Sequence, residues 1–177
     1  MTPEYTVHVP RTIAEVFKSL PEGTPAQLIE NNIVMEPAPT YYHQDILMEI
    51  STQLFNYVKK CSLGKVLVAP LDVYLGRRNV FQPDILFISN ERLSFIQKDG
   101  LHGAPDLVIE ILSPATGKYD LEEKKDVYER YGVKEYFIIE QGTHSVQSYY
   151  LVNDYFKEME DKNGEINSRL LNICVHF

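Results

Sequence analysis

Three ionisable side chains interrupt patterns that are otherwise apolar, and their types suit chemistry at a divalent metal ion. Glu110 lies inside the apolar run of residues 106–112, and Asp84 opens a second apolar run. Lys124 lies in a charged segment with helical periodicity. Carboxylate oxygens are the ligands that magnesium and manganese prefer. Two carboxylates and a lysine at one site suit metal-assisted hydrolysis of a phosphodiester, in which the metal activates water and the lysine orients it or neutralises charge.

Glu110 needs a partner because the strand expected around it is apolar on both faces. Side chains alternate along a strand, so Val108, Glu110 and Leu112 share one face. An unpaired ionised carboxylate in such a place costs several kcal/mol. Glu110 therefore requires a cation, a hydrogen-bond donor or a proton. A buried ion pair with a lysine or arginine is the structural alternative to a functional site.

Lys124 is expected to face the same sheet. At about 100° per residue, the inward stripe of its helix contains Leu121, Lys124, Tyr128 and Tyr131. The acidic residues around Lys124 point the other way. This pattern favours a cation held beside the carboxylates. The alternative is a lysine whose stem packs on apolar surface while its ammonium reaches solvent.

Asp84 gives a weaker signal by itself. Pro83 removes a backbone donor just before it, and Asp84 shares a strand face with Leu86 and Ile88. An aspartate at a strand end is also common as a turn or cap residue.

The elements that must position these residues predict an α/β fold with a mixed sheet. Thr40 is the expected N-cap of one helix, and the strand–helix–strand unit over residues 106–140 predicts a right-handed crossover if its two strands are parallel. Helices are expected over residues 11–20, 40–60 and 119–131, and strands over residues 27–35 (two strands with a turn at Asn31-Asn32), 65–75, 84–88, 106–112, 135–140, 145–152, 155–160 and 170–175.

Length and composition indicate one globular domain over residues 1–177, in which residues 1–26 form an N-terminal helical and loop extension. No segment approaches the roughly 20 apolar residues of a membrane span, and the N-terminus has no signal-peptide pattern. A cytoplasmic protein is therefore expected, with Cys61 and Cys174 as reduced thiols.

The net charge of −8 counts against a nucleic-acid partner, because such partners usually require a basic surface. The objection is partial, since bound cations cancel the charge of a carboxylate site. Two local basic clusters, Lys59-Lys60-Lys65 and Arg77-Arg78, are read more simply as solvated surface than as a nucleic-acid site.

Several motifs in one order resemble the Uma-two endonuclease family. That family belongs to the PD-(D/E)XK superfamily, which has the restriction-endonuclease-like fold, and the similarity runs from about Gln27 to the C-terminal strands. The matching residues are Gln82-Pro83-Asp84, residues 105–114 (PDLVIEILSP), Asp120, Glu123-Lys124, Tyr128 and residues 132–136 (GVKEY).

The resemblance implies that Asp84 and Glu110 are ligands of Mg²⁺ or Mn²⁺ and that Lys124 is the catalytic lysine. In the superfamily the lysine stands two residues after the second acid, where this chain has Leu112. The Uma-two family instead keeps its lysine in the following helix, which matches Lys124.

The resemblance also implies supporting residues. Glu30 matches an upstream acid of the family and is expected as an additional ligand or support. His43 and Gln44 match its first-helix motif and are expected to contact metal-bound water or substrate. For His43, a hydrogen-bonded histidine at a helix start is the equally weighted alternative.

The leading hypothesis is a magnesium-dependent DNA endonuclease. A non-catalytic binding or regulatory protein on a nuclease scaffold is the alternative, and the acidic charge and the displaced lysine favour it. Nothing in the sequence distinguishes DNA from RNA as the substrate. A homodimer is expected, because a two-fold pair commonly cuts both strands of a duplex.

Overall fold

The structure is a computed structural model that describes residues 9–21, 23–112, 118–160 and 162–177. Most of the N-terminal segment considered for a signal peptide lies outside these ranges, as do Ser113 and Pro114 of the family-like motif. The side chains of Asp120 and Leu121 also lie outside what is described.

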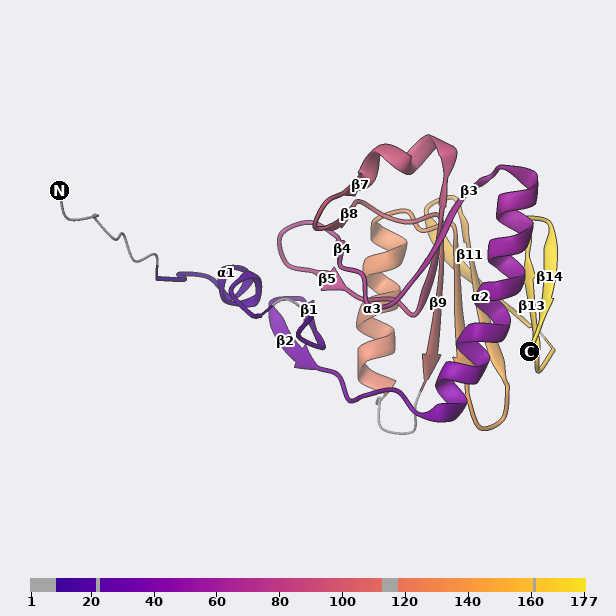
Figure 1. Cartoon of the computed structure of the whole chain (residues 1–177), viewed down its shortest axis with the longest axis horizontal. Coiled ribbons are helices and arrows are strands. Elements are labelled where there is room, and N and C mark those ends of the chain that lie inside the picture. The colour runs from indigo at the N-terminus through magenta and orange to yellow at the C-terminus, as the bar shows by residue number, and fades with distance from the viewer. Residues whose placement is uncertain (1–8, 22, 113–117, 161) are drawn as a thin grey trace.

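Three α-helices and one 3₁₀ helix separate runs of two or more strands along the described chain (Figure 1). They are α1 (Ile13–Lys18), β1 (Ala26–Ile29), β2 (Asn32–Met35), α2 (Tyr41–Cys61), β3 (Gly64–Val68), β4 (Val73–Tyr74), β5 (Val80–Phe81), β6 (Ile85–Ser89), the 3₁₀ helix η1 (Asn90–Phe95), β7 (Ile96–Gln97), β8 (Gly100–His102), β9 (Leu107–Leu112), α3 (Lys118–Arg130), β10 (Glu135–Glu140), β11 (Val146–Val152), β12 (Tyr155–Glu160), β13 (Glu165–Ser168) and β14 (Ile173–His176).

The main sheet is mixed and confirms the predicted α/β class. Its strand order is β12-β11-β10-β9-β6-β3. The strands β9 and β10, joined through α3, pair in parallel with Glu110 opposite Ile138, whereas β6 pairs with β9 antiparallel. The strand–helix–strand unit predicted from the sequence is therefore present, and the hairpin β11–β12 turns at Asn153-Asp154 as expected.

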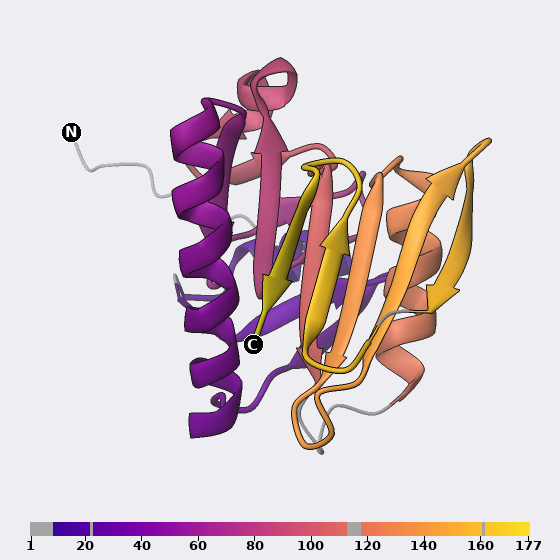
Figure 2. The same cartoon turned by 90° about the vertical axis from the view of Figure 1, so that its right-hand side faces the viewer.

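The main sheet is covered on both faces. Figure 2 shows α2 and the hairpin β13–β14 in front of the sheet and α3 behind it. Ile50 and Leu54 of α2 join the core on the first face, and Val127 and Tyr128 of α3 join the core on the second. A strand covered on both faces must be apolar on both. This is why β9 reads as a nearly continuous apolar run.

A second sheet, ordered β2-β1-β5-β4-β8-β7, lies on the α3 side of the molecule (Figure 1). Phe17 of α1 packs in a small core with Leu28 and Val80 of this sheet. Several of its strands contain only two or three residues.

The helix α2 follows its sequence pattern closely. Thr40 is the N-cap, and its Oγ1 accepts a hydrogen bond from the backbone N–H of His43 at 3.2 Å. Its apolar residues Ile46, Leu47, Ile50, Leu54 and Val58 are buried, and Tyr57 is half-buried. In the described part of the chain, no helix is long and apolar enough to cross a membrane.

Local predictions failed at four places. The strand expected over residues 65–75 ends at Val68, and β4 begins only at Val73, because Pro70 between them has no N–H to donate to a ladder. The first hairpin turns at Glu30-Asn31, both with positive φ, and not at Asn31-Asn32. Near the C-terminus, the antiparallel pair β13–β14 forms where a single strand over residues 170–175 was expected.

The fourth failure concerns the inward stripe of α3. Tyr131 is 40% exposed, because α3 ends at Arg130 and Gly132 takes a positive φ that redirects the chain. Val127, which the stripe omitted, is fully buried.

Candidate metal and active site

One cavity of about 550 Å³ brings the predicted chemistry together. It lies where the C-terminal end of β9 meets the segment before β6, the first turn of α2 and the inner side of α3. Its polar lining comes from Glu36, His43, Gln44, Gln82, Asp84, Glu110 and Lys124.

Asp84 is fixed to the neighbouring strand by its own carboxylate. It stands immediately before β6, and its Oδ2 accepts a hydrogen bond from the backbone N–H of Ile111 at 2.7 Å. The other oxygen, Oδ1, lies 3.1 Å from Nε2 of His43. Because Ile111 follows Glu110 directly, these contacts hold the two carboxylates at the same end of β9.

Glu110 is buried, with 6% of its surface exposed, and in the described part of the chain its side-chain partners come from α3. Its Oε1 accepts a hydrogen bond from the Tyr128 hydroxyl at 3.0 Å and lies 3.2 Å from the Lys124 Nζ. The pKa of Glu110 is raised to about 7, chiefly by burial and also by the Asp84 and Glu36 carboxylates, although the Lys124 ammonium and the Tyr128 hydroxyl lower it. The buried ion pair considered as the structural alternative is thus part of the site.

Lys124 does not reach out to solvent, so the snorkelling alternative is wrong. Its side chain is 7% exposed, and its Nζ lies 4.0 Å from Glu36 in addition to Glu110. Burial lowers the pKa of Lys124, but the carboxylates of Glu110 and Glu36 outweigh it, and the net pKa is raised. Lys124 is therefore a cation held among carboxylates.

His43 and Gln44 enter the cavity from the first turn of α2. Burial lowers the pKa of His43, whereas its hydrogen bond to Asp84 raises it, and the net pKa is raised. Its Nδ1 is buried and has no hydrogen-bond partner among the described residues. His43 is thus both a helix-start histidine and a direct neighbour of Asp84, while Gln44 lines the cavity.

Glu30 is placed elsewhere. It occupies the β1–β2 turn, and its carboxylate pairs with Arg78 at 2.9 Å and with Arg130 at 2.8 Å. The hydrogen bond from Asn79, followed by the two arginines, lowers the pKa of Glu30 although partial burial raises it. The structure does not bring Glu30 to the cavity, and its contacts tie the turn to the C-terminal end of α3.

Sequence reasoning missed Glu36, which follows β2 and lines the cavity. Buried Gln27 donates to Glu36, and its Oε1 accepts from the backbone N–H of Gln82 at 2.9 Å. These contacts join residues far apart in the sequence, so no local sequence pattern could predict that Glu36 lines the cavity. The Tyr128 hydroxyl was also missed, although its position four residues after Lys124 on the inward stripe was a usable signal.

The donor set fits a magnesium-like ion better than an ion that needs a complete protein cage. Among the described residues, no three His, Cys, Asp or Glu side chains surround a common point. Magnesium commonly binds through one or two carboxylates and keeps water and substrate phosphate as its other ligands. Among the described residues that line the cavity, the three carboxylates Asp84, Glu110 and Glu36 outnumber the lysine Lys124, and a bound cation would offset that excess of negative charge.

Comparisons with known proteins point to nucleases. Residues 14–172 match the model of the Uma2 family, described as "Putative restriction endonuclease". A crystal structure described as a "putative nuclease belonging to DUF820" from Anabaena variabilis is similar, with a TM-score of 0.75, 22% sequence identity and 92% of each chain covered. At that identity the likeness establishes a shared fold. The comparison with curated proteins found no match.

Proposed function

The chain belongs to the Uma2 family, which is described as "Putative restriction endonuclease", and we propose that it is a divalent-metal-dependent endonuclease that hydrolyses phosphodiester bonds in DNA. The observation that carries this proposal is the cavity shared by Asp84, Glu110 and Lys124. Its two carboxylates lie at the same end of β9, because Asp84 accepts a hydrogen bond from the residue that follows Glu110.

Asp84 and Glu110 would hold Mg²⁺ or Mn²⁺, which when bound lowers the pKa of a water and neutralises charge on the phosphodiester. His43 keeps the Asp84 carboxylate in position through the contact at Oδ1. Tyr128 orients Glu110 through its hydroxyl. Gln44, exposed at the cavity, is placed to contact the substrate backbone.

Lys124 acts as the charged donor of the site. Its ammonium orients the attacking water or stabilises the additional negative charge of the transition state. Glu36 lies 4.0 Å from the same ammonium. It therefore keeps Lys124 in place when Glu110 turns an oxygen toward a cation.

Metal dependence tests the function directly. The protein is expected to nick or linearise supercoiled plasmid DNA in millimolar MgCl₂ or MnCl₂. Excess EDTA is expected to stop cleavage, and added metal to restore it, because the bound cation lowers the pKa of the attacking water and neutralises charge on the phosphodiester. Agarose gels give the measurement, and CaCl₂ serves as a control for non-catalytic ions. Cleavage that continues unchanged in EDTA contradicts the metal-dependent mechanism.

The non-catalytic alternative is favoured by one observation, namely that Lys124 already pairs with the Glu110 carboxylate that would bind metal. Titration calorimetry separates the two functions. Magnesium or manganese binding that is lost in Asp84→Asn supports the metal site, whereas no binding at millimolar metal supports a regulatory protein. Cleavage of an RNA duplex in place of DNA would change the substrate and leave the site assignment intact.

Glu36→Gln tests the supporting role of Glu36. The substitution removes the second carboxylate beside Lys124 and leaves Asp84 and Glu110 unchanged. We expect the cleavage rate constant to fall by about 10- to 100-fold with little change in metal affinity, because a misplaced catalytic group costs about this much. Single-turnover cleavage and calorimetry give the two measurements.

Glu158→Gln is the matched control, since it removes one negative charge from an exposed site on β12. It is expected to cleave at the wild-type rate. Equal cleavage by Glu36→Gln and the wild type would assign Glu36 to the fold alone.

A further inference from the structure

We propose that two copies of this chain pair through the outer face of α2, antiparallel about a two-fold axis at Thr52. The surface concerned turns away from the sheet. Tyr41, Met48 and Phe55 recur every seven residues and are 72%, 58% and 49% exposed. A seven-residue spacing keeps side chains on one side of a helix, as in paired helices. This stripe consists of large, exposed apolar side chains with the polar Asp45 and Thr52 between them, and exposed apolar groups on one side of a helix are typical of an interaction site.

The apolar surface continues beside the helix onto β3. This strand is an edge strand of the main sheet, and its Val68 is 40% exposed. A groove of about 390 Å³ lies between the two elements and is lined by Ser51, Thr52, Phe55, Val66, Leu67 and Val68. A side chain from a partner helix at Thr52 would enter this groove.

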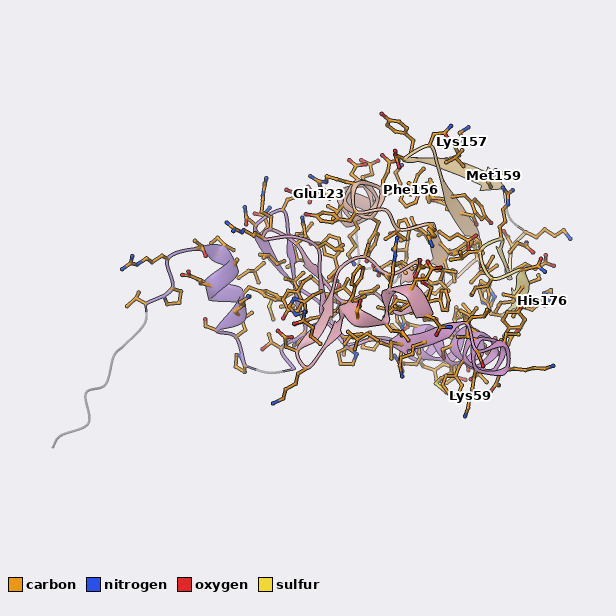
Figure 3. The ribbon with its side chains drawn as sticks, turned by 90° about the horizontal axis from the view of Figure 1, so that it is seen from above. Lys59, Glu123, Phe156, Lys157, Met159 and His176 are labelled. Atoms are coloured by element: carbon orange, nitrogen blue, oxygen red, sulfur yellow. The ribbon has the colours of Figure 1, made fainter. Side chains whose placement is uncertain are left out.

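The charges on α2 identify the occupant as a second copy. The exposed acids Asp45 and Glu49 lie in the N-terminal half of the stripe, and the exposed Lys59 and Lys60 lie at its C-terminal end. In Figure 3, Lys59 extends from α2 away from the rest of the molecule. Its Nζ lies 5.5 Å from the centre of the Phe55 ring, so the positive charge borders the apolar stripe.

An antiparallel arrangement makes this face complementary to itself. Residues equally far from Thr52 then lie opposite each other, so Asp45 of one copy faces Lys59 of the other. Met48 lies next to Phe55 of the second copy in the same register. A parallel arrangement would place like charges together, which is unfavourable. A closed two-fold pair follows, because the same patch serves both copies.

The arrangement also sets where the two cavities lie. His43 stands nine residues before Thr52, so the two histidines are about 27 Å apart along the paired helices at 1.5 Å per residue. The cavities therefore lie at opposite ends of the interface. The interface does not depend on the proposed nuclease activity, since it uses none of the residues assigned to metal or catalysis.

Cross-linking tests the register. In a full-length chain with Cys61→Ser and Cys174→Ser, Thr52→Cys is expected to give a covalent dimer with a short bis-maleimide, because the two positions meet at the axis. Lys157→Cys is the control, since this exposed site on β12 lies on the opposite edge of the sheet. It is expected to remain monomeric on denaturing gels. Equal cross-linking of both variants overturns the interface.

Light scattering tests whether the apolar stripe and the charge pair hold the dimer together. The wild-type chain of 20.4 kDa is expected at twice that mass, and Met48→Glu at the mass of one chain with an unchanged circular dichroism spectrum.

The charge pair is tested separately. Asp45→Lys is expected to raise the dimer Kd by about tenfold, and adding Lys59→Glu is expected to restore the Kd, because the charge pair is then reversed. A wild-type monomer at 100 µM, or a Met48→Glu dimer, would overturn the proposal whatever the outcome of the cleavage assay.

Discussion

Asp84→Asn is expected to reduce DNA cleavage by about a thousandfold and to abolish magnesium binding, with little change in thermal stability. The asparagine carbonyl can still accept the hydrogen bond from the Ile111 N–H, and its amide can still contact His43. What it loses is the negative charge that a metal ligand requires. A loss of this size is typical when the main electrostatic stabilisation of a transition state is removed. Single-turnover plasmid cleavage and calorimetry give the two measurements.

Glu110→Gln is expected to reduce cleavage equally but to destabilise the fold as well. It leaves the buried Lys124 ammonium with Glu36 as its remaining carboxylate, at 4.0 Å. Breaking a buried pair in this way is costly, whereas replacing both partners by apolar groups is often neutral. The double variant Glu110→Gln/Lys124→Met should therefore recover stability without recovering activity. Wild-type cleavage by both Asp84→Asn and Glu110→Gln would overturn the assignment of this cavity as the nuclease site.

Glu110 could be identified as a candidate site residue from the sequence, whereas the sequence pattern around Asp84 gave only a weak signal. Glu110 contradicts its surroundings, since a carboxylate in an apolar strand needs an explanation under any fold. The helical periodicity separately placed Lys124 on the face of its helix that packs against the sheet. A buried carboxylate needs a cation and a buried lysine needs a carboxylate, so the two observations supported each other. Asp84 opens its strand without any such contradiction. Its importance depends on a hydrogen bond to Ile111, 27 residues away, which no local pattern encodes.

Other features escaped prediction because they depend on contacts between residues that are distant in the sequence. The second sheet is built from very short strands, and β4 pairs in parallel with β8. Periodicity cannot reveal strands of two or three residues whose partners are distant in sequence. Glu36 depends on the same long-range assembly, because its place follows from Gln27 and Gln82. Glu30 resembled a ligand by its position along the chain, but the turn at Glu30-Asn31 directs its carboxylate toward two arginines.

Asp106 is a fully buried carboxylate with ion-pair partners, and its substitution tests how much such pairs contribute to the free energy of unfolding. It stands immediately before β9, and its Oδ1 lies 2.8 Å from Lys134 Nζ and 3.5 Å from Arg92 Nε. Its Oδ2 accepts the backbone N–H of Ser89 at 2.8 Å. Asp106→Ala removes these bonds at the start of the central strand. The free energy of unfolding at pH 7 is expected to fall by about 3 kcal/mol, as measured by urea denaturation.

The pH dependence of that difference identifies the charge as its source. Burial raises the pKa of Asp106, but the Lys134 ammonium, the Ser89 hydrogen bonds and Arg92 outweigh it, and the net pKa is lowered. A carboxyl with a lowered pKa stabilises the fold fully above its unfolded pKa of about 3.9. That stabilisation is lost as the pH falls through the lower folded value. The gap between wild type and Asp106→Ala should therefore stay constant from pH 7 to about pH 5 and narrow in stronger acid. The control variant Asp99→Asn changes a surface carboxylate paired with His102 and should have nearly the wild-type free energy of unfolding. If the stability difference between wild type and Asp106→Ala stays unchanged in strong acid, packing and not the ion pairs stabilises this end of β9.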